Sequence, residues 1–168
     1  VGLLLFSNEI ELYIPPKKGR SHVLRIIRGL LEFQPKHHQT DLKKALEFLS
    51  DVMKKKAIVF MLSDFMDQGY EKPLKIVAKK HDVTAIRVFD PKEVEIPDLG
   101  LIPVWDMETG LTHTVDTSSA RVRLAYKAHY LRQIDYFKTQ FTRSGAGIIH
   151  NRTDEDYVKN LLGYFKRV

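Results

Sequence analysis

Two oxygen-bearing side chains stand where an α/β protein could bind a ligand. Thr40 opens a predicted helix, and Asp64 follows residues 57–62, an apolar run typical of a buried strand. In open α/β sheets, ligands gather at the carboxyl ends of the strands, where helix amino termini also point. Hydroxyl and carboxylate oxygens are ligands for hard cations. Thr40 and Asp64 therefore predict part of a metal site whose remaining ligands come from another strand.

A further carboxylate, Asp67, permits a different chemistry. In some phosphoryl-transfer enzymes a strand-end aspartate attacks phosphorus while a neighbouring carboxylate handles the proton. Asp64 and Asp67 have the spacing D-x-x-D, whereas haloacid-dehalogenase-like phosphatases have D-x-D after the first strand. The sequence also has no nucleophile elbow, P-loop or G-x-G-x-x-G motif. We expect that the protein is not an enzyme, and a metal-dependent hydrolase using Asp64 and Asp67 is the weaker alternative.

Plain structural roles compete with ligand binding at both positions. Thr40 stands where the N-cap of the helix would lie, and threonine is a common N-cap residue. Asp64 could cap the turn that follows its strand. Each role would explain the residue type without any ligand.

The elements that would position these residues follow from hydrophobic periodicity, which switches repeatedly between strand-like and helix-like spacing. This alternation predicts an α/β sandwich with a mostly parallel sheet. The length of 168 residues and the hydrophobic content of 43% indicate a single domain over residues 1–168. Predicted strands span residues 1–6, 9–14, 57–62, 83–89, 101–105, 111–115 and 147–150, and helical stripes span residues 23–31, 42–53, 74–78, 122–141 and 157–165.

Composition excludes several function classes. The absence of cysteine removes disulfides, thiolate metal sites and thiol catalysis, and it fits a reducing compartment. The longest apolar runs have six residues, too few for a membrane-spanning helix, which needs about 20. We expect a cytoplasmic protein, with an anchor upstream of the sequence left open because the sequence begins in mid-strand.

The net charge of +6 invites a nucleic-acid interpretation, so the positions of the cations matter. Residues 54–56 and residues 79–80 are lysines at the ends of predicted helices, where cations complement the helix dipole. Residues 17–20, K-K-G-R, form a loop that could hold a phosphate, but no aromatic residue is interleaved with it. We therefore predict no specific nucleic-acid binding.

Several segments along the whole sequence resemble the von Willebrand factor type A domain, and more closely its bacterial branch catalogued as domain of unknown function 58. They appear in the order expected for that branch. The resemblance implies a Rossmann-like, three-layer sandwich. The segments are V-G-L-L-L-F-S at 1–7, T-D-L-K-K-A-L at 40–46, L-S-D-F at 62–65, A-I-R-V-F-D-P-K-E at 85–93 and D-M-E-T-G at 106–110.

The resemblance implies a metal-ion-dependent adhesion site. In that family a D-x-S-x-S loop after the first strand, a threonine and a later aspartate arrange oxygen ligands around Mg²⁺. Thr40 matches the family threonine and Asp64 the family aspartate. The D-x-S-x-S loop is absent before Val1, so we expect Mg²⁺ only in a domain that carries this motif, and none in residues 1–168 alone.

Residues 116–120, D-T-S-S-A, imitate the missing loop, but alanine replaces its last serine. This segment immediately precedes a long predicted helix and follows a predicted hairpin strand. Capping of the helix is the favoured explanation, and a metal loop is the alternative.

The resemblance also implies a partner and a structural consequence. Members of this branch resemble companions of MoxR-type AAA+ ATPases, which implies a non-catalytic domain that captures an acidic side chain of a protein partner during complex assembly. A metal-free interaction scaffold is the competing hypothesis. The strand that carries D-x-S-x-S lies centrally in the family sheet, between the strands at residues 1–6 and 57–62. Without it we expect an N-terminally truncated domain that is unstable alone or self-associates through its exposed sheet.

Overall fold

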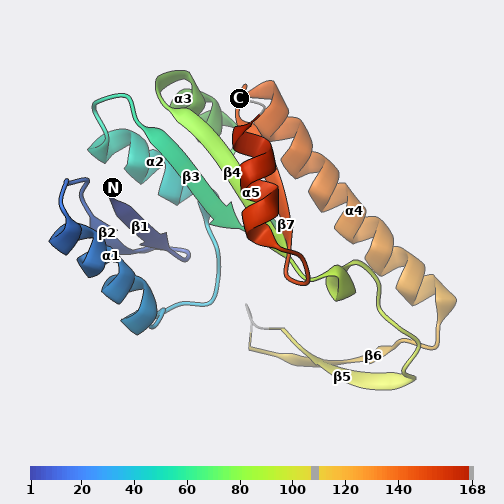
Figure 1. The fold of residues 1–168 in the computed structure, drawn as a ribbon. Coiled ribbons are helices and arrows are strands. Elements are labelled where there is room, and N and C mark those ends of the chain that lie inside the picture. Colours follow the sequence, from blue (N-terminus) through green and yellow to red (C-terminus); the bar gives the residue numbers. More distant parts are fainter. Residues whose placement is uncertain (107–109, 167–168) are drawn as a thin grey trace.

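The computed structural model describes residues 1–106 and 110–166 as a mixed α/β protein with three separate sheets (Figure 1). The largest sheet is parallel and has the strand order β3–β4–β7, formed by Ile58–Ser63, Asp82–Phe89 and Gly147–Arg152. Its register pairs Ile58 with Asp82 and Thr84 with Gly147. The predicted parallel strands are therefore present, but the other two sheets are antiparallel pairs, so the prediction of one mostly parallel sheet holds for this sheet alone.

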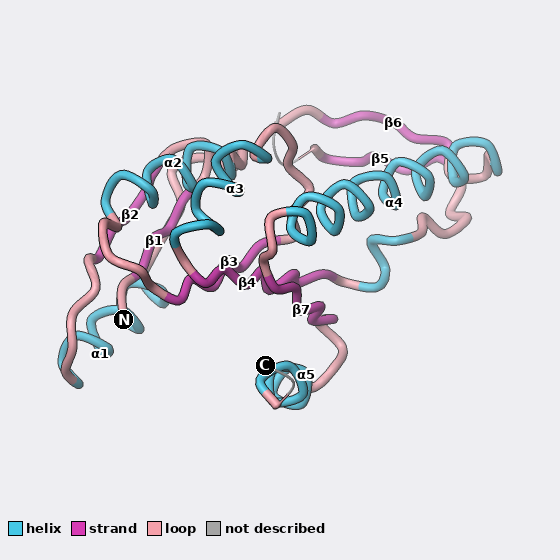
Figure 2. Tube along the Cα trace, turned by 90° about the horizontal axis from the view of Figure 1, so that it is seen from above, coloured by secondary structure: helices cyan, strands magenta, loops and turns pink. Residues whose placement is uncertain are grey.

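Three helices cover one face of the parallel sheet: α2 (Leu42–Val52), α3 (Glu71–Lys80) and α4 (Ala120–Arg143) (Figure 2). The fully buried centre of this layer is aromatic, because Phe65 stacks on Phe137 with ring centroids 4.5 Å apart and meets Phe141 edge-on. Helix α5 (Tyr157–Phe165) lies on the opposite face, where the Tyr164 hydroxyl is 3.3 Å from Thr84 Oγ1. The middle strand β4 is buried between these layers.

A smaller unit packs beside this core. Strands β1 (Leu3–Phe6) and β2 (Ile10–Ile14) form an antiparallel pair, as the alternating pattern predicts. Helix α1 (Arg20–Glu32) covers one face of the pair, where Gly29 faces the side chains of Leu12 and Ile14. Helix α2 lies on the other face, with Phe48 edge-on to Tyr13 at 5.3 Å. Helices α1 and α5 thus lie on the same side of the molecule (Figure 2).

Strands β1 and β3 are not paired with each other, although both end at the start of α2. Ser7, just after β1, accepts a hydrogen bond from Asp41 N, and Asp67, after β3, accepts one from Leu42 N. We call this end of the strands the carboxyl edge and the opposite end the amino edge. The break in pairing falls where the resemblance places a central strand.

Strand β3 is an edge strand with one wet face, which corrects the prediction of a buried strand at residues 57–62. Ile58, Phe60 and Leu62 are 68%, 43% and 62% exposed, on the face that carries α5. Val59 and Met61 point the other way and pack on the core. A continuous apolar run predicts two covered faces. Here the second face is covered only in part, by Phe165 of α5 against Phe60.

The predicted hairpin is present as β5 (Leu101–Trp105) and β6 (Thr112–Asp116), which follow the short 3₁₀ helix η1 (Pro91–Val94). Of the predicted hairpin turn, Glu108 and Thr109 lie outside the described residues. Buried Thr117 fastens the hairpin base, since its hydroxyl donates to Gly100 O at 2.7 Å and accepts from Leu99 N at 2.9 Å.

Two helices bury less of their apolar stripe than periodicity predicts. In α1 only Ile26 is buried, whereas Leu30 and Leu31 are 51% and 81% exposed. In α4 the buried residues begin at Tyr130, because the first turns extend beyond the parallel sheet alongside η1 and the hairpin. None of the described helices combines the length and the apolar character needed to cross a membrane.

A buried histidine lies between α3 and β4. His81 is 3% exposed, and neither ring nitrogen has a hydrogen-bond partner among the described residues. Burial, with a smaller contribution from the Lys80 charge, lowers the pKa of His81 below its ordinary value of 6.5. The ring is therefore kept neutral in the folded protein at pH values where an unfolded chain would begin to bind a proton.

We expect His81 to make the fold sensitive to acid. The unfolded chain binds the His81 proton more readily, so the free energy of unfolding is retained above about pH 6.5 and falls as the pH drops toward the lowered pKa. The substitution His81→Phe should reduce the difference in free energy of unfolding between about pH 8 and about pH 5.5. Urea unfolding followed by circular dichroism measures both values.

His113→Phe, on the exposed hairpin, is the matched control and should leave that difference unchanged. Some acid sensitivity remains in His81→Phe because burial, Lys138 and Arg87 also lower the pKa of His150. An undiminished difference in His81→Phe would contradict the assignment.

Candidate functional site

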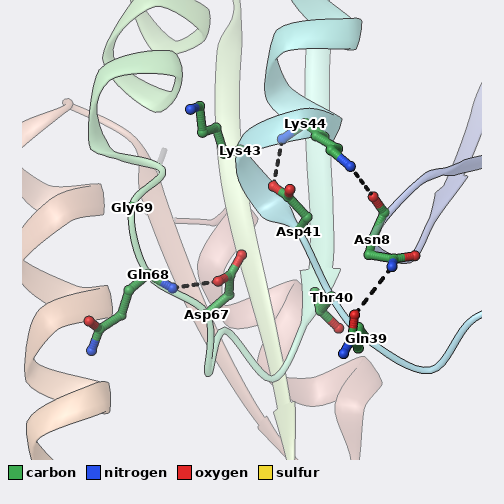
Figure 3. A pocket seen from close by; sticks show the side chains of 9 residues that line it. All are labelled: Asn8, Gln39, Thr40, Asp41, Lys43, Lys44, Asp67, Gln68 and Gly69. Carbon is green, nitrogen blue, oxygen red and sulfur yellow. Dashed lines mark hydrogen bonds between the residues drawn. The ribbon is translucent and has the colours of Figure 1, made fainter. Parts of the chain in front are cut away.

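A pocket of about 600 Å³ opens at the carboxyl edge, between the tip of the β1–β2 pair, the start of α2 and the loop after β3 (Figure 3). Three segments that are distant in the sequence meet there. The lining residues are Asn8, Gln39, Thr40, Asp41, Lys43, Lys44, Asp67, Gln68 and Gly69.

Two carboxylates hold the first turn of α2 at the pocket. Asp41 is the N-cap, and its Oδ1 accepts from Lys44 N at 2.8 Å. Asp67 reaches across from the loop after β3, and its Oδ2 accepts from Leu42 N at 2.7 Å. These bonds satisfy main-chain donors that a helix start leaves free, and both carboxylates complement the positive end of the helix dipole.

Thr40 is not the N-cap, which corrects the structural alternative drawn from the sequence. The side chain of its neighbour Asp41 takes that role, and Thr40 Oγ1 has no hydrogen bond to any described residue. Threonine and aspartate both cap helices well, so the sequence T-D-L could not decide between them. The Thr40 hydroxyl lines the pocket with its oxygen available to a ligand.

Asp64 fills the structural role expected of it and stays exposed. Its Oδ1 accepts from Met66 N and from the Ser63 hydroxyl, both at 3.3 Å, while Ser63 Oγ accepts from Phe65 N. These bonds support a tight turn in which Phe65 has a φ of 57° and is fully buried. Asp64 lies at the same edge as Thr40 but is not among the pocket-lining residues, and no hydrogen bond joins the two side chains.

A buried arginine supports the loop that carries Asp64. Arg87 in β4 is 3% exposed, and its Nε donates to the Asp64 carbonyl oxygen at 3.2 Å. Its guanidinium also donates to the Tyr130 hydroxyl and lies 4.0 Å from the centre of the Phe89 ring. Arg87 makes no ion pair with a described carboxylate, so carbonyl, hydroxyl and ring contacts hold its charge. Sequence reasoning did not single out this residue.

Two lysines that sequence reasoning missed, Lys43 and Lys44, line the pocket together with Asp41 and Asp67. Lys44 is held in place, because its Nζ donates to Asn8 O at 2.9 Å. Lys43 is exposed and makes no ion pair with the described residues. Their signal in the sequence was their position directly after Thr40 in the first turn of a predicted helix. The pocket therefore offers a hydroxyl and an ammonium group to an acidic ligand.

The other candidate carboxylates, Asp67 and Asp116, accept hydrogen bonds from described groups of the protein. Both oxygens of Asp67 accept main-chain hydrogen bonds, from Leu42 N and from Gln68 N. Asp116 accepts from the Ser118 main chain and hydroxyl, which lowers the pKa of Asp116. Ser119 is the N-cap position of α4, although its side chain makes no capping bond. Within residues 1–106 and 110–166, no three Asp, Glu or His side chains form a cluster suited to a metal ion.

Comparison with known sequences identifies one family over most of the chain. The model of the family described as "Protein of unknown function DUF58" matches residues 1–136. An uncharacterized protein of Mycobacterium avium is 29% identical over 162 residues, which cover 91% of this chain and 92% of that protein. An uncharacterized protein of Mycobacterium tuberculosis (strain H37Rv) is 27% identical over 98% of this chain, and the chain spans about half of that relative, 52%.

Two solved structures share the fold. A conserved hypothetical protein, BatB from Bacteroides thetaiotaomicron, aligns with 99% of this chain and 76% of its own, with a TM-score of 0.56 and 13% identity. An aerotolerance-related membrane protein from Bacteroides fragilis aligns with 92% of this chain and 71% of its own, with a TM-score of 0.51 and 15% identity. At this level of identity the likeness concerns the fold alone.

The different roles of Asp67 and Thr40 predict different stability effects. Asp67→Ala removes the acceptor for Leu42 N and should lower the free energy of unfolding by about 1 kcal/mol. Thr40→Val removes only a hydroxyl without a described partner and should change it by less than about 0.5 kcal/mol. Urea unfolding at neutral pH measures both. A Thr40→Val loss as large as that of Asp67→Ala would show that Thr40 has a structural role after all.

Proposed function

The chain belongs to the protein family of unknown function DUF58. We propose that it is a non-catalytic protein-interaction domain. Its binding site is the pocket at the carboxyl edge, and its ligand is an acidic side chain of a protein partner. The observation that carries this proposal is the Thr40 hydroxyl, which lines the pocket without a hydrogen bond to any described residue. An enzyme is disfavoured because the Asp67 oxygens cap main-chain donors.

In the proposed mechanism a divalent cation strengthens this capture. Thr40 supplies a hydroxyl oxygen and Asp64 a carboxylate oxygen, since Asp64 Oδ2 makes no hydrogen bond with the described residues. Both groups are at the carboxyl edge, and their chemistry suits Mg²⁺, which prefers oxygen ligands in octahedral geometry. In the family that the sequence resembles, the remaining protein ligands come from a D-x-S-x-S loop, a motif that residues 1–168 do not contain. When bound, the ion supplies positive charge that an incoming carboxylate can satisfy.

A metal-free scaffold is the second candidate, and one observation favours it. Lys43 lies in the first turn of α2, at the positive end of the helix dipole, and is not neutralised by an ion pair. This charge can attract a carboxylate without an ion. The two candidates differ in whether partner binding depends on divalent metal.

The partner that we propose is a MoxR-type AAA+ ATPase or a component assembled by one, in the cytoplasm. This proposal rests on the resemblance of residues 40–46 and 62–65 to that branch of von Willebrand A-like domains. The absence of cysteine is compatible with a reducing compartment.

Metal titration separates the two candidates. In a protein that includes the D-x-S-x-S loop, Thr40→Val and Asp64→Asn should each weaken Mg²⁺ binding at least about tenfold, because each removes a ligand oxygen. Isothermal titration calorimetry with MgCl₂ measures the affinity, and binding of a fluorescent Glu-rich peptide with and without EDTA measures the consequence.

Asp90→Asn is the control, because Asp90 lies at the same edge but caps η1. Peptide binding that is unaffected by EDTA and lost in Lys43→Glu would support the scaffold instead. Turnover of a phosphate ester that depends on Asp64 and Asp67 would contradict both candidates.

We also propose that residues 1–168 alone associate through the exposed face of β3. The main-chain groups of its unpaired edge and the exposed side chains of Phe60 and Leu62 can contact a second copy of the chain. Sedimentation velocity should show dimers or larger species that grow with concentration, and Leu62→Lys should shift them toward the monomer. Leu124→Lys, on α4, is the matched control because Leu124 is 67% exposed against 62% for Leu62. A monomer at all concentrations would rule out this association.

A further inference from the structure

Three clusters of cations that are far apart in the sequence each lie next to the start of a strand, at the amino edge of the molecule. Residues 17–20 precede and begin α1, residues 54–56 precede β3, and residues 79–80 end α3 just before β4. Hydrogen bonds between Val1 and Lys17 place the first cluster where β1 begins. In Figure 1 the loops that lead into β3 and β4 and the carboxyl-terminal end lie on the upper side of the molecule, and the amino-terminal end lies at the left, beside the start of β1.

The cations of these three clusters make no ion pairs with the described residues. All of the lysines and arginines in the three clusters are exposed except Lys80, which is half-buried. None of them forms an ion pair with a described carboxylate, whereas Arg123, Lys127 and Arg152 near the carboxyl edge do. Exposed Asp51 and Asp82 lie in the same segments and leave a large excess of positive charge.

Helix dipoles explain only part of this excess. Lys79 and Lys80 occupy the last turn of α3, where cations are favoured. Lys17, Lys18 and Arg20 instead surround the start of α1, which has no acidic residue in its first turn. Cations at that end oppose the dipole, so structural stability does not account for them. Such a cluster indicates that the charge serves binding.

Two exposed apolar side chains lie on elements that reach the amino edge. Ile58 begins β3 and is 68% exposed, and Phe165 ends α5 and is 52% exposed. The neighbouring Lys166 is also exposed. The Phe165 ring meets Phe60 of β3 edge-on at 5.9 Å, so it is only partly exposed. Lysines together with partly exposed apolar side chains suit an anionic bilayer surface, where the ammonium groups meet phosphates and the apolar groups enter the headgroup region.

From this arrangement we infer that the amino edge docks on the surface of a bilayer that contains anionic phospholipid. The charge complementarity is long-range and needs no groove, and the pocket at the carboxyl edge is not part of it. Nucleic acid is the less suitable polyanion, because the clusters are mainly lysine and the three of them contain no aromatic side chain for base stacking. This inference does not depend on the proposed function, since it concerns the opposite edge of the molecule.

Vesicle flotation tests the inference with the 168-residue chain. The protein should bind vesicles of phosphatidylcholine with about 25% phosphatidylserine and not vesicles of phosphatidylcholine alone. Binding should weaken strongly as salt rises from about 0.05 M to about 0.5 M. Replacing Lys54, Lys55 and Lys56 with glutamine should weaken it on the order of a hundredfold, because three surface-facing charges are lost.

The matched control replaces Lys92, Arg121 and Arg132 with glutamine, which removes the same charge from exposed positions outside the amino edge and should have little effect. A second variant, with glutamine at Lys17, Lys18 and Arg20, should behave like the first, and circular dichroism verifies that each variant is folded. Equal losses in the control would show a non-specific charge effect. Binding to neutral vesicles, or stronger binding to duplex DNA than to anionic vesicles at the same salt, would overturn the inference.

Discussion

Helix α2 is the connection on which the arrangement of this protein depends, because the two units beside it share no strand pairing. Its inner side chains Leu42 and Leu46 enter the aromatic core over the parallel sheet. Its Phe48 packs on Tyr13 of the small antiparallel pair. The helix start is tied to both units as well, through Ser7 on one side and Asp67 on the other. A helix that packs on both sheets can fix their relative position without hydrogen bonds between their strands.

The same attachment creates the candidate site. A helix start presents free main-chain donors and positive potential, which suits an anion or carboxylate. In this protein Asp41 and Asp67 use two of those donors, so the capping demand is met without Thr40. The Thr40 hydroxyl and Lys43 then line the pocket without a hydrogen bond or ion pair to a described residue. Because Asp41 and Asp67 cap the helix, Thr40 remains free to bind a ligand.

Periodicity in the sequence predicted the order and type of the elements well, because the strand and helix spacings are distinct. It predicted burial less well, since burial depends on what covers a face. Residues 57–62 are uniformly apolar, yet Ile58 and Leu62 are exposed because β3 has no neighbour on one side. The N-cap was misplaced by one residue because Thr40 and Asp41 are both good caps. Arg87 was missed altogether, since a lone arginine in an apolar run carries no local signal of its partners Asp64 and Tyr130.

The three cation clusters lie at the same edge of the molecule, although they are far apart in the sequence. Residues 17–20, 54–56 and 79–80 each have a plausible local explanation when they are considered separately. The parallel sheet brings the starts of β3 and β4 to one edge, together with the lysines that precede them. The start of β1, which belongs to the antiparallel pair, carries the third cluster through its hydrogen bonds to Lys17. The pocket lies at the other edge by the same rule, because Thr40 and Asp67 precede helices that run back toward the strand starts. An anionic surface at the amino edge would therefore leave the pocket facing away from it, open to a protein partner, and the two sites could be occupied together.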